Sequence, residues 1–465
     1  MTPVSTRTYL RRRHGRPTAV LGAAVLALGL AACAPGSTGG EEGGTETEAS
    51  DVETDVAAMG DVTLTVWDQE VRGGQDEQIE ELNAAFMEQY PNVTIERDSR
   101  SFNDLRQTLR RAITGNAAPD VVQANNGRTD MGQFVQAGLL RPLDGYAEVY
   151  GWTERFPESV RALASYTEDG ATFGEGHLYG LAQVGEVVGV WYSKSKLDGL
   201  GLEIPTTTEE FEAALEAARE SGDLPIQFGN LDGWPGIHDF GFVQNQYVSR
   251  EEIRDLGFGR EGASWTSEAN VTAAETFTDW VESDYFTEGF NGLGYDPAWQ
   301  AFADGEGTFL VAGTWLLADL EAAMGEDLGF FLPPVGPSGE QAVTGGTGLP
   351  FAITEASENP DVAAAYIDFI TSEDAMTAIA DAGNLPVVDA DPSAVDGAQA
   401  EVFQAWETAG EQDALVPYLD YATPDFYDLL TAQVKALGGG STSSEEFLDA
   451  LESEYTSFTS ENTGG

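Results

Sequence analysis

The chain has 465 residues, enough for two or three domains with separate cores, and 42% of them are hydrophobic, so most of it is expected to fold. Its formal net charge of −57 repels nucleic acids and anionic lipid headgroups, which excludes both as partners of the folded part. A single cysteine excludes an internal disulfide, a cysteine-rich metal site and a CxxC redox centre.

The first residues have the pattern of an export signal. A run of arginines precedes residues 18–30, an apolar stretch that is too short to span a bilayer. The tetrapeptide LAAC follows and ends at Cys33; it resembles a bacterial lipobox, in which the cysteine is lipidated and becomes the mature N-terminus. The resemblance implies a lipoprotein signal peptide at 1–32 and lipidation of Cys33. A plain signal peptide with an incidental cysteine is the alternative.

Residues 33–60 are rich in Gly, Thr, Ser and Glu, with little to bury, and this composition predicts a flexible tether. The fold is expected to begin after it, with a half-buried strand at 62–66. A helical pattern then runs to Tyr90, followed by a second strand at 93–95.

A second helical pattern occupies 102–113, and a third strand follows at 120–123. This β-α-β-α-β order predicts a parallel sheet with right-handed crossovers. Ligands of such sheets lie beyond the carboxyl ends of the strands, so segments 67–70 and 125–128 are the first candidates for a binding site.

Residues 187–192 form a β-branched and aromatic run that predicts a strand. We interpret it as the first crossing between two lobes, with Glu186 at the crossing; an ordinary buried strand in one larger domain is the alternative. Past it, Thr207 and Glu210 have the spacing of a capping box at the start of a helix. Residues 227–242 have a loop-like, aromatic composition.

Later segments again alternate between short strands and helices. A short apolar strand is predicted at 308–311, just before Trp315, and a glycine-rich run at 344–348 precedes a further apolar segment. Helices are predicted from Pro360 onward, and the last one carries Phe447 and Tyr455.

The sequence offers little for catalysis. Beyond the signal region only His177 and His238 are histidines, and neither an HExxH pattern nor a GxSxG elbow occurs. With 79 acidic residues some carboxylate pair is always available, so such pairs do not indicate a glycoside hydrolase. We expect no catalytic residue, no metal and no cofactor.

Binding of a sugar needs flat rings that stack on the apolar face of a pyranose and fixed polar groups that bond its hydroxyls. Aromatic and polar residues with this chemistry occur at predicted strand ends and loops, although core packing is the alternative for each ring. They are Trp67, Asp68, Gln69, Asn125, Asn126, Asn230, Trp234, Trp315 and Tyr427.

The order and spacing of several segments resemble the bacterial extracellular solute-binding proteins that serve ABC importers, specifically the carbohydrate branch that includes maltodextrin-binding proteins. These segments include VTLTVWDQE, APDVVQANNG, FADGEGTFLVAGTW and GGTGLPFAITEASENPDVAAAYIDFI. The resemblance covers most of residues 60–460. It implies an α/β periplasmic-binding-protein type II fold, with two α/β lobes that close on a ligand in the cleft between them.

Carried over, the resemblance places lobe 1 at 61–181 and 344–389 and lobe 2 at 182–343 and 390–465. It assigns a sugar-packing ring to Trp315, a second aromatic near Phe426 or Tyr427, and the carboxylate at the crossing to Glu186. In the glycine-rich run, Gly346 and Thr347 complete the expected ligand-binding set.

The function implied is that of a monomeric substrate-binding component of an ABC transporter, lipid-anchored at the extracellular face of the cell membrane. It would capture a sugar or oligosaccharide and deliver it to a membrane permease. A binding protein for a peptide or a glycerol-phosphate compound is the second possibility, with Arg128 as the candidate phosphate ligand. A secreted glycoside hydrolase is the third.

Overall fold

A computed structural model of the protein describes residues 46–115 and 117–462. The predicted signal peptide and Cys33 lie outside these residues. Within the described part, no helix has the length and apolar character that a membrane span requires.

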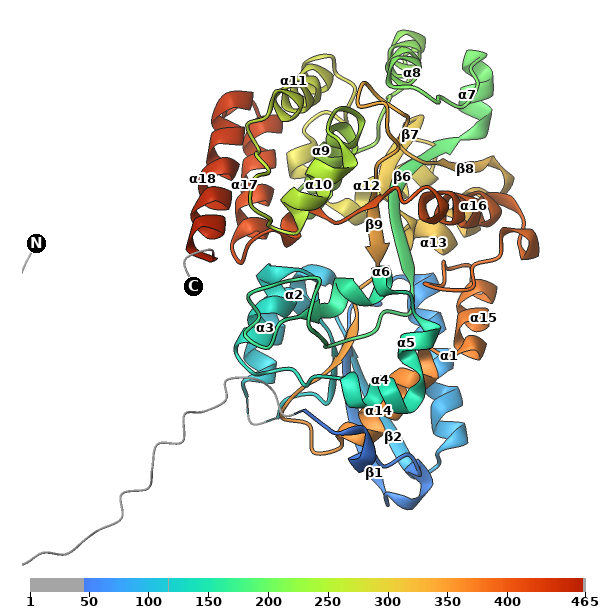
Figure 1. The fold of residues 1–465 in the computed structure, drawn as a ribbon. Coiled ribbons are helices and arrows are strands. Elements are labelled where there is room, and N and C mark those ends of the chain that lie inside the picture. Colours follow the sequence, from blue (N-terminus) through green and yellow to red (C-terminus); the bar gives the residue numbers. More distant parts are fainter. Residues whose placement is uncertain (1–45, 116, 463–465) are drawn as a thin grey trace, which may run out of the picture. The chain divides into compact units, whose positions relative to one another are not determined.

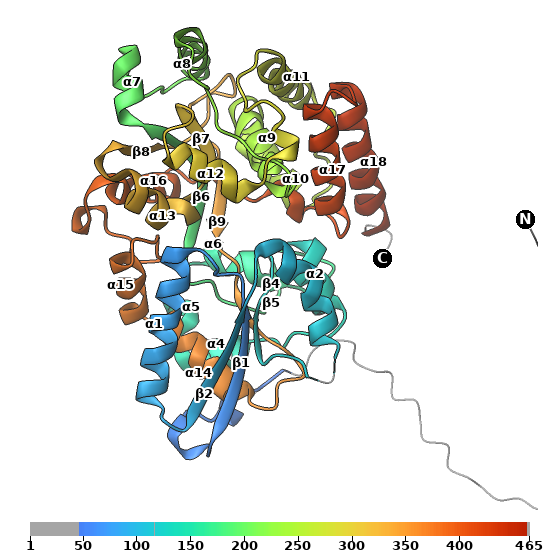
Figure 2. The same ribbon diagram turned by 180° about the vertical axis from the view of Figure 1, so that it is seen from behind.

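The first lobe is built on a sheet with strand order β10-β3-β1-β2 (Figures 1 and 2). Strands β1 (Val62–Asp68), β2 (Val93–Ser99) and β3 (Val121–Gln123) are parallel, and β10 (Phe351–Ile353) joins β3 in the antiparallel sense. Helices α1 (Gly73–Gln89) and α2 (Phe102–Ile113) connect the parallel strands, so the predicted β-α-β-α-β unit is confirmed.

Helices and short elements complete the first lobe, and α14 packs beside α1 (Figure 2). They are η3 (Arg128–Gly132), α3 (Gln133–Gln136), α4 (Asp144–Tyr150), α5 (Trp152–Arg155), α6 (Glu158–Arg161), β4 (Ser165–Tyr166), β5 (His177–Leu178), α14 (Pro360–Ile370) and α15 (Glu373–Asp381).

The second lobe is built around β6 (Gly185–Ser193), in which every residue is buried. Its neighbours β7 (Phe309–Gly313), β8 (Leu328–Phe331) and β9 (Val343–Thr347) are antiparallel to it, and β11 (Leu415–Val416) is parallel to β9. The predicted strand at 187–192 is therefore the central strand of a second sheet.

The helices of the second lobe surround this sheet, and the capping box of Thr207 and Glu210 is present at the start of α8. These helices are α7 (Lys194–Leu200), α8 (Thr208–Ser221), α9 (Trp234–Tyr247), α10 (Arg250–Gly257), α11 (Glu268–Glu282), α12 (Tyr295–Ala303), α13 (Leu317–Met324), α16 (Gly397–Glu411), α17 (Phe426–Gly438) and α18 (Ser444–Asn462).

The chain passes between the two sheets near Leu181, which forms a bridge with Phe351, and again between β9 and β10. Because β9 pairs with β6, the return to the first lobe falls after Thr347 and not at 344 as predicted. The glycine-rich sequence carries no strand signal of its own, and only the pairing with β6 makes it a strand.

Two further expectations are corrected. Residues 46–60, assigned to the tether, include short helical turns and a fully buried Val56, since the few apolar side chains of this segment pack on the first lobe. The segment expected to be a loop at 227–242 contains most of α9. This helix is buried on nearly all sides, so its sequence lacks the amphipathic period that would have revealed it.

Candidate functional site

A cleft enclosing about 640 Å³, part of it open to solvent, lies where the carboxyl ends of first-lobe strands face α9 and α17 of the second lobe. The residues that line it are Gln69, Arg72, Phe102, Asn125, Glu186, Trp234, Ile237, His238, Trp315, Thr347, Leu349, Tyr418, Asp420, Tyr421 and Tyr427.

Aromatic rings of the second lobe form one wall of the cleft. Trp234 lies edge-on to Trp315 with ring centroids 5.9 Å apart, and 4.3 Å from Tyr295. The indole nitrogen of Trp315 donates to the hydroxyl of Tyr295 at 2.6 Å. These contacts hold both indoles in place, so the wall is ready for stacking before a ligand arrives.

Trp315 owes its position to the residue two places before it. A Cβ on Gly313 would lie 1.9 Å from the indole of Trp315, so only glycine allows the ring to fold back over the end of β7. The glycine of the sequence AGTW thus determines where the Trp315 ring lies.

Buried carboxyl groups face the rings. Glu186, on β6, accepts a hydrogen bond from the Tyr418 hydroxyl at 3.3 Å, and burial together with the charge of Glu70 raises its pKa to about 8. Burial raises the pKa of Asp420 to about 7. At both groups the nearby cations lower the pKa less than burial raises it. The cleft therefore holds acidic groups that a ligand can use as hydrogen-bond partners.

Glu70 lies beside this group, just outside the lining. One of its carboxyl oxygens accepts from Gln123 at 2.8 Å, whereas the other is buried and has no partner among the described residues. Burial raises its pKa to about 7.

His238 lies among the rings of Trp234, Trp315 and Tyr418. Burial lowers its pKa to about 3, so the imidazole is neutral at physiological pH. It therefore contributes an aromatic face and a polar nitrogen to the cleft, without charge.

Two arginines differ in their relation to the cleft. Arg72 lines it, and its guanidinium pairs with Asp296 at 3.0 Å. Arg128 lies outside and donates to backbone carbonyls of Phe258 (2.9 Å) and Ala422 (3.2 Å). Burial lowers the pKa of Arg128 to about 10. Arg128, the residue predicted to bind a phosphate, thus uses its guanidinium to bond backbone carbonyls.

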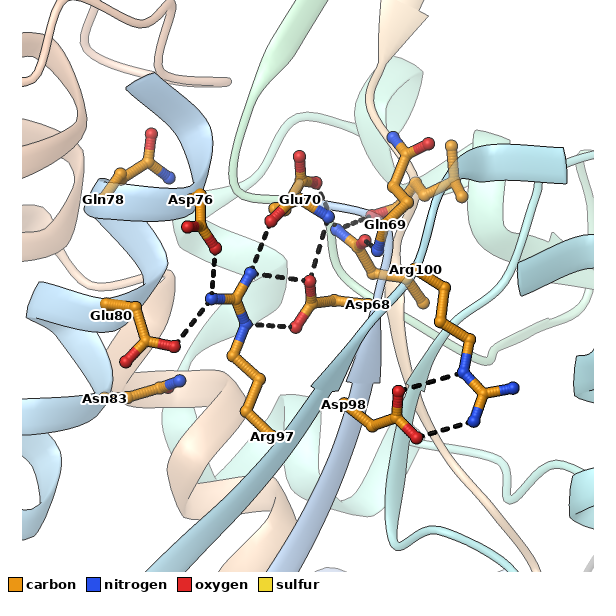
Figure 3. A network of polar contacts seen from close by, with 12 residues as sticks. Asp68, Gln69, Glu70, Asp76, Gln78, Glu80, Asn83, Arg97, Asp98 and Arg100 are labelled. Carbon is orange, nitrogen blue, oxygen red and sulfur yellow. Dashed lines mark hydrogen bonds and ion pairs between the residues drawn. The ribbon is translucent and has the colours of Figure 1, made fainter. Parts of the chain in front are cut away.

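Asp68, predicted to bind ligand, instead belongs to an ion-pair network behind the cleft (Figure 3). Its carboxylate is fully buried and accepts two bonds from Arg97, at 2.7 and 2.9 Å. Arg97 also pairs with Asp76 and Glu80 and donates to the backbone oxygen of Glu70. The network fixes the loop after β1, and this loop carries Gln69 and Arg72 into the cleft.

The other predicted residues that the structure places outside the cleft lining also have structural partners. Trp67 lies under the guanidinium of Arg100, 3.7 Å from its ring centroid, at the end of β1. Asn126 donates to the backbone oxygen of Leu163 at 2.6 Å. Gln69, two places after Trp67, and Asn125, next to Asn126, do line the cleft.

Asn230 and Gly346 are also outside the lining. The amide oxygen of Asn230 accepts from the backbone N–H of Gly236, in the first turn of α9, and its nitrogen donates to Asn291. Gly346 lies in β9, where a Cβ would come within 2.3 Å of Leu163. Both residues stabilise elements that carry the cleft.

Of the predicted set, the structure brings together Gln69, Asn125, Glu186, Trp234, Trp315, Thr347 and Tyr427. Sequence reasoning missed the residues that complete the lining: Arg72, Phe102, Ile237, His238, Leu349, Tyr418, Asp420 and Tyr421. Three of them, Tyr418, Asp420 and Tyr421, belong to an aromatic and acidic stretch at 418–427, and this composition could have indicated them from the sequence. No group of three or more potential ligands for a metal occurs in the described residues.

The pattern of a family described as bacterial extracellular solute-binding protein matches residues 72–377. The multiple sugar-binding protein of Streptococcus mutans is 20% identical over 316 residues, which are 67% of this chain and 72% of that protein.

Solved structures with the same fold include a chitin oligosaccharide binding protein (TM-score 0.71, 21% identity, 86% of this chain and 99% of that chain). Another is a bacterial solute receptor described as having an exclusive substrate preference for β-D-galactopyranose (TM-score 0.73, 17% identity, 85% and 99%). The predicted two-lobe type II fold is confirmed by these likenesses.

Proposed function

Because this chain belongs to the family of bacterial extracellular solute-binding proteins, we propose that it is the substrate-binding component of an ABC transporter and captures a sugar in the cleft described above. The observation that carries this proposal is the arrangement of the lining. Fixed indole and phenol rings of one lobe face amide and carboxyl groups that come from the other lobe and from the crossing strand.

The lining supplies both halves of sugar recognition. Trp234, Trp315 and Tyr427 present rings for the apolar C–H face of a pyranose. Asn125 and Glu186 present groups that bond vicinal hydroxyls, each net bond contributing about 0.5–1.5 kcal/mol. Several such bonds must converge, and the cleft draws them from both lobes.

A phosphorylated ligand is disfavoured. Among the described residues that line the cleft, Arg72 is the single cation, and Asp296 already pairs with it. Glu186 and Asp420 would repel an anion whenever they are ionised. The relative from Streptococcus mutans, named for binding multiple sugars, supports the same choice.

The transport cycle then consists of capture, lobe closure and delivery to a membrane permease, and no bond is made or broken. Export by the predicted signal peptide and lipidation of Cys33 would hold the protein, as a monomer, at the extracellular face of the membrane. The family of the chain and the lipobox-like LAAC sequence support this location.

The experiment is a titration of the intrinsic tryptophan fluorescence with mono- and oligosaccharides, followed by product analysis of every sugar that binds. We expect saturable quenching without turnover. Trp315→Ala should weaken binding at least about tenfold, whereas Trp67→Ala, whose ring lies on Arg100 outside the lining, should preserve it. A response to peptides or phosphorylated solutes alone would refute sugar binding, and release of a cleaved sugar would show an enzyme.

A further inference from the structure

The cleft has more acidic than basic groups. Among the described residues that line it, Glu186 and Asp420 are acidic and Arg72 is the single cation. The guanidinium of Arg72 already pairs with the carboxylate of Asp296 at 3.0 Å. A positively charged group of a ligand would therefore meet more attraction than repulsion from the lining.

Glu70, just outside the lining, adds a third carboxyl group. The residue is 4% exposed, and one carboxyl oxygen is buried without a partner among the described residues. The other oxygen accepts from Gln123, whose amide also donates to the backbone oxygen of the lining residue Leu349 at 3.4 Å. Figure 3 shows the carboxyl group pointing away from the guanidinium of Arg97, which bonds the backbone oxygen of Glu70. The unpartnered oxygen is thus an acceptor at the edge of the cleft.

Glu186 lies beside the same short segment of chain. A Cβ on Gly348 would come within 3.1 Å of its carboxyl oxygen Oε1, so this oxygen lies close to the backbone that joins β9 to β10. The second oxygen, Oε2, accepts from the hydroxyl of Tyr418. The charge of Glu70 raises the pKa of Glu186 more strongly than the charge of Arg72 lowers it. The two carboxyl groups are therefore neighbours, and each acts on the other with a like charge.

The rings next to this pair of carboxyl groups also suit a cation. The ring centroid of Tyr418 lies 5.3 Å from that of His238, and His238 lies 5.4 Å from Trp315. The face of a tryptophan or tyrosine ring attracts a cation that comes within about 6 Å of its centroid. Because burial lowers the pKa of His238 to about 3, the imidazole carries no charge that would oppose one.

From the paired carboxyl groups, the unpartnered oxygen and the adjacent rings, we propose that the cleft takes an amino sugar, whose ammonium group binds between Glu70 and Glu186. The inference rests on the proposed sugar-binding function and concerns the chemical class of the sugar. An ammonium group has three N–H donors, so it bonds the unpartnered oxygen of Glu70 and an oxygen of Glu186 together. Its charge also stabilises the ionised form of both carboxyl groups, which a neutral hydroxyl does not do.

The test is calorimetric titration of the purified protein at pH 7 with glucosamine, glucose and N-acetylglucosamine, and with the three corresponding galactose compounds. Each is used as the monosaccharide and as its β-1,4-linked disaccharide. The N-acetyl compound keeps the nitrogen but not its charge, so it separates the effect of charge from that of size. In the series that binds, we expect the amino sugar to bind at least about tenfold more tightly than both neutral analogues.

The outcomes separate this inference from the function on which it rests. A neutral analogue that binds as tightly as the amino sugar would overturn the inference and leave the sugar-binding function intact. The same holds if only neutral sugars of the wider panel described above bind. Absence of binding by every sugar would overturn the sugar-binding function, and the inference with it.

Two variants test the assigned residues. Glu70→Gln and Glu186→Gln keep the size of each side chain and an acceptor oxygen but remove its charge. Each should lower the ratio of amino-sugar to neutral-sugar affinity at least about fivefold. Glu77→Gln, at an exposed position of α1, removes the same charge outside the lining and should leave the ratio unchanged.

Unchanged ratios in both glutamine variants would show that these carboxyl groups do not bind the ammonium group. Thermal unfolding checks that each variant is folded. If Glu70→Gln does not fold, Glu186→Gln, on the crossing strand, decides the test by itself.

Discussion

Two neighbouring regions of the molecule treat buried carboxyl groups in opposite ways. Behind the cleft, Asp68 is fully buried and bound by the guanidinium of Arg97 through two hydrogen bonds. Inside the cleft, Glu186 is also buried, but its described side-chain partner is the neutral hydroxyl of Tyr418. The first carboxylate is satisfied by the protein, whereas the second keeps bonding capacity for a ligand.

The difference shows how adjacent polar residues divide their roles. A paired, buried carboxylate fixes a loop, and removing its cation leaves an uncompensated charge. A carboxyl group that has a raised pKa and an oxygen without a charged partner can accept or donate a hydrogen bond. Type of residue and nearness to a strand end do not distinguish the two; the position of a cation does.

The largest expected effect is on the network behind the cleft. Arg97→Ala leaves Asp68 buried without its cation and should lower the free energy of unfolding by about 3–5 kcal/mol, as measured by urea denaturation. Arg100→Ala breaks a pair whose carboxylate, on Asp98, is 44% exposed, and it should cost no more than about 1 kcal/mol. Similar losses for both variants would contradict the distinction.

The next effect is the pH dependence of Glu186. Since its pKa rises from 4.5 in the unfolded chain to about 8 in the fold, the folded state holds an extra proton between these values, and the stabilisation of the folded state is lost as pH increases towards 8. Glu186→Gln should remove this dependence.

The variant should therefore gain stability over the parent protein as pH rises from 5 to 8, by at most about 1.4 kcal/mol per pH unit. Urea denaturation at several pH values measures this difference. Glu77→Gln, at an exposed position, is the control and should follow the parent at every pH. A constant offset for Glu186→Gln would mean that its carboxyl group does not titrate in this range.

A smaller effect separates two tryptophans that the sequence could not tell apart. Trp234→Ala removes a ring from the cleft wall and should weaken sugar binding at least about tenfold. Trp67→Ala removes a ring that lies on Arg100, and sugar affinity should stay within about twofold. Calorimetric titration measures the sugar affinity of both variants. A loss of affinity in Trp67→Ala would show that Trp67 also binds the sugar.

The smallest effect concerns the approach of the lobes. Gly74→Ala places a methyl group against Ala318 of α13 and should lower sugar affinity severalfold, because it opposes closure without touching the lining. Gly410→Ala, where nothing lies within 4 Å of the added Cβ, is the matched control. If both variants bind like the parent protein, the lobes tolerate the extra methyl group.

Much of the architecture could be predicted from local pattern. Strands β1 and β2 and helices α1 and α2 have a hydrophobic spacing that matches their secondary structure, and β3 and β6 have short apolar runs of strand length. The capping box at Thr207 fixes the start of α8 within a few residues. Helix α9, which is buried on nearly all sides, and the glycine-rich β9 have neither signal, and these two were misread.

The sequence by itself determined the β-α-β-α-β unit and the aromatic and amide groups at strand ends, because both follow from short-range order, whereas the two lobes were implied by the resemblance to a family. Only the tertiary structure decided which of these groups reach the ligand. Arg97, 29 positions after Asp68, forms an ion pair with that carboxylate. Tyr418, 232 positions after Glu186, donates its hydroxyl to Glu186 in the cleft. Contacts between residues so far apart depend on packing of the whole chain, which no local pattern encodes.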